Sequence, residues 1–142
     1  MSTVTSPSPL ADLPGRPCPI AAALEVVGER WALLVVRELV FGNERFTDIV
    51  RGTGAPRDRV AARLKALEQV GIVRRSAYQD APLRHAYTLT EAGAALRPVL
   101  DALLLWGEEY AVAADDPDRG RRPRLPSHPT APSQPSHPEE TR

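Results

Sequence analysis

The alternation of apolar and polar residues predicts a series of helices interrupted by one pair of strands. Residues 31–41, WALLVVRELVF, are apolar on nearly every side, which is typical of a buried helix. The next long helix instead carries one apolar stripe, Val60, Leu64 and Leu67, at the spacing of a single helix face. The expected helices are residues 19–27, 31–41, 45–50, 56–70 and 91–110, and the expected strands are residues 72–78 and 84–89, around a loop at residues 80–82.

Proline and threonine mark where several of these elements begin or break. Pro56 is expected at the first helical position, where its missing N–H would be unpaired in any case. Thr90 is expected to cap the last helix, and Thr47 or a neighbour to cap the short helix near residue 45. Pro98 should bend or break the last helix, because it removes a backbone donor and clashes with the preceding turn.

The order of the elements predicts the fold. A short helix, a turn that contains glycine and an amphipathic helix with a polar outer face form a helix-turn-helix. The two strands that follow would form a wing. We therefore predict a mainly α fold with a two-stranded β wing, a winged helix-turn-helix. In that geometry the second helix enters the major groove of DNA by its N-terminal end, and the wing reaches the backbone or the minor groove.

Proline is concentrated at both ends of the chain, which locates the folded part. Of the 15 prolines, five lie in residues 1–19 and seven in residues 117–142. Because proline fixes φ and lacks a backbone donor, such segments do not sustain helices or central strands. We expect a flexible N-terminal arm at residues 1–17, a folded domain at residues 18–112 and a disordered, proline-rich tail at residues 113–142.

The formal net charge is zero, with 18 basic and 18 acidic side chains, but the charges are unevenly distributed. Residues 42–86 contain nine basic and five acidic side chains, a local excess of +4. This segment is the predicted helix-turn-helix and wing. The coincidence of a basic segment with a DNA-binding arrangement favours a double-stranded DNA partner.

Several motifs in fixed order resemble one known family. They are Cys18-Pro19-Ile20, Gly28-Glu29-Arg30-Trp31, Arg45-Phe46-Thr47-Asp48-Ile49, Arg63-Leu64-Lys65-Ala66-Leu67-Glu68, Gly71-Ile72-Val73, Tyr87-Thr88-Leu89-Thr90-Glu91-Ala92-Gly93, Pro98-Val99-Leu100 and Trp106-Gly107. Over about residues 17–110 the sequence resembles the HxlR-type winged helix-turn-helix transcriptional regulators of bacteria. The resemblance implies a cytoplasmic homodimer, paired through its N- and C-terminal helices, that binds a near-palindromic operator and regulates neighbouring genes, with repression the expected outcome.

The chain departs from the family at two positions. Pro56 and Ala61 stand where family members often carry a hydroxyl residue, so recognition should depend more on charged side chains. Arginine can bond guanine with two hydrogen bonds, aspartate can accept from cytosine, and lysine neutralises phosphate. The candidate DNA contacts are Thr47, Arg57, Asp58, Arg59, Ala62, Arg63, Lys65, Arg75, Gln79 and Arg84.

Three of these candidates have a second interpretation. Arg63 lies near the buried edge of its helix, so its head group could contact either a phosphate or Glu68. Only one of Arg74 and Arg75 should reach DNA, because successive strand residues face opposite sides. Gln79, near the tip of the wing, is either a minor-groove contact or an ordinary surface residue.

Cys18 is the single cysteine of the chain and also has two interpretations. Some members of the family that the chain resembles sense quinones, aldehydes or oxidants through an N-terminal cysteine, which makes an electrophile or another small molecule a candidate effector. Without a second cysteine in the chain, only a pair between subunits or an adduct could form. The alternative is a small buried residue at the dimer interface.

The last helix carries more apolar residues than one side of a short helix usually buries, which favours dimerisation. They are Leu96, Val99, Leu100, Leu103, Leu104 and Trp106. The aromatic residues Trp31, Phe41, Phe46, Tyr87 and Trp106 are all expected to serve packing.

Other functional classes lack their motifs. The sequence has no phosphate loop, nucleophile elbow or ligand cluster, so we expect neither an enzyme nor a metal site or cofactor. No apolar run approaches the ~20 residues that a bilayer span requires, and we expect no signal peptide. The competing hypothesis is a winged-helix module that only mediates protein–protein contacts, with the arginines as a solubilising surface.

Overall fold

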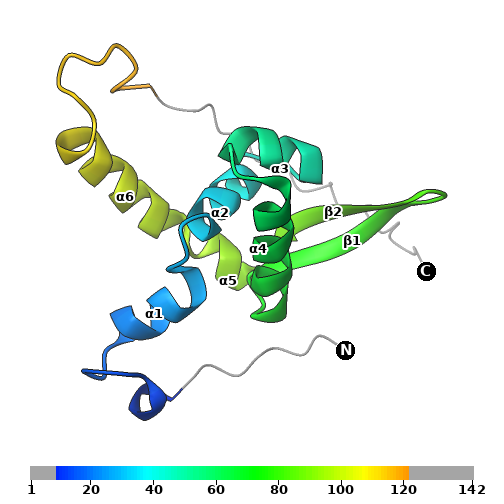
Figure 1. Ribbon diagram of the computed structural model, residues 1–142, viewed down its shortest axis with the longest axis horizontal. Coiled ribbons are helices and arrows are strands. Elements are labelled where there is room, and N and C mark those ends of the chain that lie inside the picture. Colours follow the sequence, from blue (N-terminus) through cyan, green and yellow to red (C-terminus); the bar gives the residue numbers. More distant parts are fainter. Residues whose placement is uncertain (1–8, 122–142) are drawn as a thin grey trace, which may run out of the picture.

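The computed structural model describes residues 9–121, and in that part of the chain helices are combined with one two-stranded sheet (Figure 1). The elements are a 3-10 helix at Leu10–Asp12, α1 at Pro19–Val27, α2 at Ala32–Val40, α3 at Phe46–Thr53, α4 at Arg57–Gln69, β1 at Val73–Asp80, β2 at Leu83–Leu89, α5 at Glu91–Ala94 and α6 at Arg97–Tyr110. This order confirms the predicted winged helix-turn-helix, with α3 and α4 as its two helices and β1–β2 as the wing.

Helix α2 is the centre of the core, as the apolar pattern of residues 31–41 predicts. None of its residues is exposed. Val35 and Val36 are fully buried and pack in one cluster with Ile49 of α3 and Val60 of α4. The two helices of the helix-turn-helix are therefore held by contact with the same third helix.

Helix α4 buries the predicted stripe and no more. Val60, Leu64 and Leu67 are its buried residues. The helix begins one residue later than expected, because Pro56 occupies the capping position with extended backbone geometry and accepts the backbone N–H of Arg59. The outer face of α4 is thus available from its first turn.

The predicted cap at Thr47 is wrong. Arg45 occupies the capping position of α3, and no side chain caps the helix. The reason is a tertiary contact: Arg45 forms an isolated β-bridge with Ala86, and the Glu44 carbonyl accepts the backbone N–H of Tyr87 at 2.8 Å. Pairing with β2 keeps this segment extended up to Arg45, so α3 starts at the next residue.

The wing is longer than the sequence predicts. Strands β1 and β2 pair antiparallel, from Val73 opposite Leu89 to Asp80 opposite Leu83. The register shifts between Ala77 and Gln79, so a bulge absorbs one extra residue, and pairing continues to Asp80, the first residue of the expected loop. The ribbon projects to the right in Figure 1, on the side of the molecule away from α1 and α6.

Thr90 joins the end of the wing to the helices on both sides of it. Its hydroxyl accepts the backbone N–H of Gly93 at 3.2 Å, which confirms the predicted cap at the start of α5. The same hydroxyl donates to the carbonyl of Gly71 at 2.5 Å, just after α4. One side chain therefore ties α4, β2 and α5 together.

The expected long helix at residues 91–110 is broken, as predicted from Pro98. Helix α5 ends at Ala94, and α6 restarts at Arg97 with Pro98 in its first turn. Beyond α6, the Arg119 guanidinium donates to the Glu108 carbonyl at 2.6 Å, so this start of the expected tail folds back on the helix. Residues 1–8 of the expected arm and 122–142 of the tail lie outside the described residues.

Helix α6 has no buried residue and presents an apolar stripe to solvent. The expectation that Trp106 packs in the interior is wrong, because 61% of its surface is exposed and it contacts the Tyr110 ring at a centroid distance of 5.6 Å. The stripe consists of Val99, Leu103, Trp106 and Tyr110. Helical periodicity reveals that a face is apolar, but not that another part of the same chain covers it.

Gly93 lies where α5 passes the beginning of β1, and this close approach generates a stability prediction. An added Cβ would overlap the backbone carbonyl oxygen of Ile72 and come within 2.9 Å of the Leu89 side chain. Because a backbone carbonyl cannot rotate away, Gly93→Ala should lower the free energy of unfolding by about 1–3 kcal/mol. Urea denaturation followed by circular dichroism measures this change.

Gly107→Ala is the matched control, because nothing lies within 4 Å of an added Cβ at that position of α6. Alanine favours a helix by about 0.8–1 kcal/mol over glycine, so this variant should be as stable as the parent or more so. Equal losses in the two variants would contradict the steric explanation.

Candidate nucleic-acid interface

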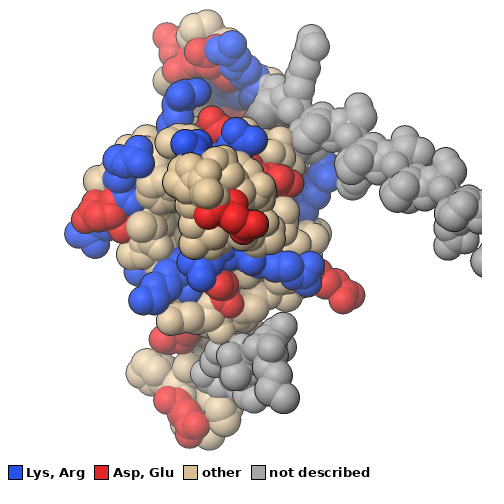
Figure 2. All heavy atoms as spheres, turned by 90° about the vertical axis from the view of Figure 1, so that its right-hand side faces the viewer, with Lys and Arg blue, Asp and Glu red and all other residues tan. Residues whose placement is uncertain are grey.

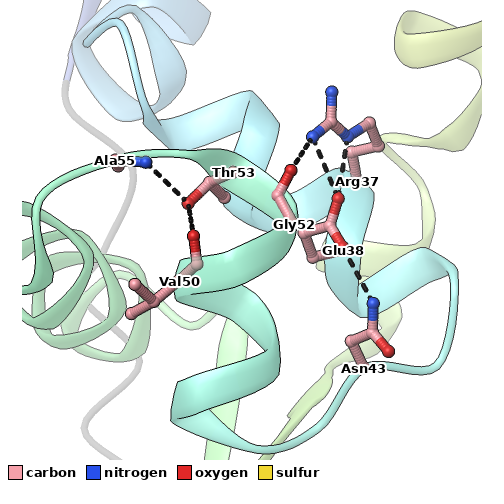
Figure 3. Close-up of polar contacts among 7 residues, drawn as sticks. All are labelled: Arg37, Glu38, Asn43, Val50, Gly52, Thr53 and Ala55. Atoms are coloured by element: carbon pink, nitrogen blue, oxygen red, sulfur yellow. Dashed lines mark hydrogen bonds and ion pairs between the residues drawn. The ribbon is translucent and has the colours of Figure 1, made fainter.

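The turn between α3 and α4 is fixed by the side chain of Thr53 (Figure 3). The Thr53 hydroxyl donates to the carbonyl of Val50 at 3.2 Å and accepts the backbone N–H of Ala55 at 3.2 Å. Gly54, between them, has φ of 70°, a left-handed conformation that glycine adopts without strain. Ala55 is buried, so the turn itself is part of the core.

A buried carboxylate joins α2 to the end of α3, and sequence reasoning missed it. Glu38 is 4% exposed, and its carboxylate accepts from Asn43 Nδ2 at 2.8 Å and from Arg37 Nε at 3.0 Å. Arg37 Nη2 in turn donates to the carbonyl of Gly52 at 2.8 Å (Figure 3). The signal available in the sequence was a single Glu within an otherwise apolar helix, since a buried charge requires partners.

Gly52 permits this arrangement because a Cβ at that position would overlap the Glu38 carboxylate. The carboxylate is therefore packed directly against the backbone of α3. Together these contacts fix how α3, and through its turn α4, lies on α2.

The first turn of α4 presents charged side chains to solvent. Arg57, Asp58 and Arg59 are exposed, and so are Ala62 and Lys65 further along the same helix. Within residues 9–121, neither Arg59 nor Lys65 makes an ion pair. These two cations remain available to a ligand.

Arg57 has a partner of a different kind. Its guanidinium carbon lies 5.0 Å from the centroid of the Phe46 ring in α3, a cation–π contact. Thr47, the next residue of α3, is exposed beside it. The structure therefore brings the predicted contacts Thr47 and Arg57 to adjoining parts of one surface.

Arg63 and Arg75 are engaged in ion pairs that hold α4 in place. Arg63 Nε lies 3.5 Å from the carboxylate of Glu29, which also accepts the backbone N–H of Trp31. Arg75 of β1 lies 3.7 Å from the carboxylate of Glu68. Of the two partners considered for Arg63, the alternative Glu68 is wrong, because residues five apart point about 140° away from each other around a helix.

The wing contributes exposed cations on both strands. Arg74, Arg75 and Arg84 are all exposed, and within the described part of the chain Arg74 and Arg84 make no ion pair. Gln79 lies near the tip of the wing, as expected, one residue before the end of β1. It pairs with Arg84 across the ribbon, and its side chain donates to the Ala81 carbonyl at 3.2 Å.

A hollow of about 330 Å³ lies where the wing meets the start of α3. Its lining includes Arg45, Thr47, Tyr78, Arg84 and His85. The Arg45 guanidinium carbon lies 4.8 Å from the Tyr78 ring centroid. Sequence reasoning named Thr47 and Arg84 as site residues but not the other three, whose proximity depends on the bridge between residue 45 and β2.

Figure 2 looks onto the side of the molecule from which the wing projects. Lys and Arg side chains surround the wing on this face, with acidic side chains interspersed among them. This face of the molecule is therefore rich in basic side chains around the wing. Such a face attracts a polyanion by steering and by release of its counterions.

Cys18 is not part of this face. It is half-buried and occupies the capping position of α1, which lies on the other side of the molecule from the wing (Figure 1). Its thiol caps no backbone N–H. A chemical change at Cys18 would therefore affect the basic face only through the fold or through a second chain.

Two further findings concern the described residues alone. Within residues 9–121, no helix is long and apolar enough to cross a lipid bilayer. The same residues contain no group of three or more His, Cys, Asp or Glu side chains that could hold a metal ion.

Comparison with known families gives one match that covers most of the chain. A family model described as HxlR-like helix-turn-helix matches residues 26–115. These residues include α2–α6 and the wing, and therefore all ten candidate DNA contacts.

Individual relatives agree with this match. The chain is 44% identical over 98 residues to the HTH-type transcriptional regulator Rv3095 of Mycobacterium tuberculosis. The match covers 69% of this chain but only 62% of the relative, which is just under two thirds of its length. It is 34% identical over 100 residues to the HTH-type transcriptional regulator YodB of Bacillus subtilis, covering 69% of this chain and 89% of the relative.

Solved structures of two regulators have the same fold. The reduced form of YodB from B. subtilis matches with a TM-score of 0.56 at 35% identity, covering 66% of this chain and 93% of that one. The reduced form of the redox regulator HypR matches with a TM-score of 0.60 at 30% identity, covering 65% of this chain and 92% of that one.

Proposed function

The chain belongs to the HxlR-like helix-turn-helix family, and we propose on this basis that it is a sequence-specific DNA-binding transcriptional regulator. The observation that carries the proposal is the exposed first turn of α4, with Arg57, Asp58 and Arg59 directed outward beside a basic wing. Relatives named as transcriptional regulators support it. No enzymatic activity is part of the proposal, and a protein that binds chromosomal operators would act in the cytoplasm.

The proposed binding mode places α4 in the major groove. Arg59 and Asp58 would read base edges, and the methyl group of Ala62 could pack on a thymine methyl. Lys65 would neutralise a phosphate. The wing would reach the backbone or minor groove through Arg84, while Arg75 and Gln79 would contact DNA only after giving up their present partners.

The remaining candidates have supporting roles in this binding mode. Thr47 and Arg57 would contact the backbone beside the start of α4. Arg63 would turn to a phosphate only if it released Glu29. We assign the DNA-binding domain to residues 18–112, which is supported by the start of α1 at Pro19 and the end of α6 at Tyr110.

Arg59→Ala tests the reading of bases by α4. If Arg59 bonds a base, the variant should bind its operator about 1–3 kcal/mol more weakly and lose preference at that base pair. The operator is first selected from a random duplex library, and affinity is then measured by fluorescence anisotropy across a salt series. Arg16→Ala is the charge-matched control, because residue 16 is exposed before α1 and should leave the affinity unchanged.

The competing function is a module for protein contacts without specific DNA binding. It predicts that no sequence is enriched from the library, or that binding is equally strong for all sequences. Either result contradicts the regulator proposal.

We further propose that the protein is a homodimer whose near-palindromic operator matches its two-fold symmetry. The support is the exposed apolar surface of α1 and α6: Ile20 is 69% exposed, Leu24 59%, and Tyr110 73%. Repression of a neighbouring gene would then follow if the dimer occupies a promoter.

Trp106→Glu tests the dimer. Trp106 is large, apolar and central in the α6 stripe, so a carboxylate there should weaken dimerisation by at least about 2 kcal/mol. Sedimentation velocity should show a shift from dimer to monomer. Leu105→Glu introduces the same charge at an exposed position off the stripe and should remain dimeric; a Trp106→Glu dimer of unchanged stability would refute the interface.

A redox response through Cys18 is a second candidate property, supported by its partial exposure and by the likeness to YodB and to the redox regulator HypR. In a dimer, diamide could oxidise the Cys18 thiols of the two chains to one disulfide, with both protons and electrons passing to the diamide. The alternative is that Cys18 only fills space at the interface.

Cys18→Ser separates these two roles. The redox proposal expects diamide to change the operator affinity of the parent protein, to yield a covalent dimer on a non-reducing gel, and to leave the variant unaffected. If diamide changes neither affinity nor covalent state in the parent protein, Cys18 has only the packing role.

A further inference from the structure

A groove of about 470 Å³ lies between α2 and α6 and has no role in the DNA-binding surface. Its floor is apolar and includes Leu33 and Val40 of α2 and Leu100 and Leu104 of α6. This volume is within the range of small-molecule sites, about 300–1,000 Å³. The groove is therefore large enough for an organic molecule of one or two rings.

The polar side chains that line the groove are predominantly cationic. Arg37, Arg97 and Arg121 line it, against a single carboxylate, Asp101. Arg97 is half-buried, and within residues 9–121 it makes no ion pair; Arg121 is paired with Asp118 at 3.2 Å. A partly desolvated guanidinium that makes no ion pair, beside an apolar floor, favours an anion with an apolar body.

The groove and the apolar stripe of α6 lie on adjoining faces of the helix, and Leu103 belongs to both. The stripe follows the spacing i, i+4, i+7 and i+11 from Val99 to Tyr110, which is one side of a helix. Leu100 and Leu104, on the groove side, each lie about 100° around the helix from the stripe residues that precede them. A second copy that covers the stripe would therefore reach the groove at Leu103 and leave Leu100 and Leu104 facing a different direction.

We propose that this groove binds an amphipathic organic anion, an aromatic or branched aliphatic carboxylate, with its apolar body on Leu100 and Leu104 and its carboxylate on Arg97. Guanidinium and carboxylate form paired, charge-assisted hydrogen bonds, which supply orientation as well as affinity. The leucines contribute by removing apolar surface from water.

Arg37 connects this site to the helix-turn-helix, and this step rests on the proposed function. Arg37 lines the groove, yet its Nη2 donates to the Gly52 carbonyl at the end of α3. A ligand carboxylate carries a full negative charge and can accept two parallel hydrogen bonds from one guanidinium, which a backbone carbonyl cannot. The bound anion therefore draws Arg37 away from Gly52, loosens α3 on α2 and lowers the affinity for the operator.

Calorimetric titration with 2-naphthoate, in the absence of DNA, tests the site. The parent protein should bind one naphthoate per chain, and the neutral analogue 2-naphthalenemethanol should bind about tenfold more weakly or not at all. Arg97→Gln should weaken naphthoate binding by a similar factor of about ten, because it removes the charge and keeps a polar group. Leu104→Glu places a carboxylate in the groove and should abolish binding.

Two matched variants control for charge alone. Arg74→Gln removes one positive charge on the wing, and Leu105→Glu adds one negative charge to α6 outside the groove; both should bind naphthoate like the parent. Circular dichroism checks that each variant is folded. The proposal is overturned if naphthoate does not bind the parent protein. It is also overturned if the Arg97→Gln and Leu104→Glu variants both bind naphthoate as tightly as the parent does.

A second copy of the chain in the groove is the rival occupant. It predicts that naphthoate does not bind and that Leu104→Glu dissociates the dimer in sedimentation, and this result also overturns the proposal.

The link to DNA has a separate measurement. Saturating 2-naphthoate should lower operator affinity about tenfold, and the operator should weaken naphthoate binding by the same factor, because coupling between two sites is reciprocal. Naphthoate binding without any change in operator affinity overturns the route through Arg37. A protein that binds no specific DNA refutes the proposed function, while the titration without DNA still decides the site.

Discussion

A carboxylate in a protein core must keep its hydrogen bonds, and the arrangement of the helix-turn-helix depends on how Glu38 does so. The Glu38 carboxylate accepts hydrogen bonds from Asn43, in the turn before α3, and from Arg37 of its own helix. Arg37 also donates a hydrogen bond to the carbonyl of Gly52 at the end of α3. Loss of one partner would leave a buried charge uncompensated, which costs more than the ion pair gains. The contacts at both ends of α3 are thus enforced by one acidic group, and the apolar core fills the space between them.

The cations of the molecule divide into two groups by their partners. Arg63 and Arg75 are ion-paired to neighbouring elements, so they position α4 between the start of α2 and the wing. Arg59 and Arg84 are exposed, and in the described part of the chain they make no ion pair. Arginine therefore both stabilises the packing of α4 and supplies the exposed cations that we propose contact DNA. Partial exposure to solvent keeps the ion pairs of Arg63 and Arg75 modest in energy.

The sequence predicted those features of the fold that depend on residues within a single helix or at its ends. The stripe of α4, the cap at Thr90 and the break at Pro98 follow from spacing and backbone chemistry within a few residues. Features that depend on distant partners were not predicted: the Arg63–Glu29 pair, the Glu38 network and the hollow around Arg45. Trp106 was expected both to pack and to belong to the surplus apolar stripe of the last helix, and spacing alone does not show that no other part of the described chain covers it.

The interruption between α5 and α6, just before Pro98, would affect the distance between the two α4 helices of a dimer. Helix α5 is tied to the wing through Thr90, while α6 carries the apolar stripe. In a dimer joined along α6, the angle at residues 95–96 sets the separation of the two α4 helices. In such a dimer, a small change in backbone direction at these two residues would alter the spacing between the operator half-sites. It would do so without changing any residue of the proposed DNA-binding surface.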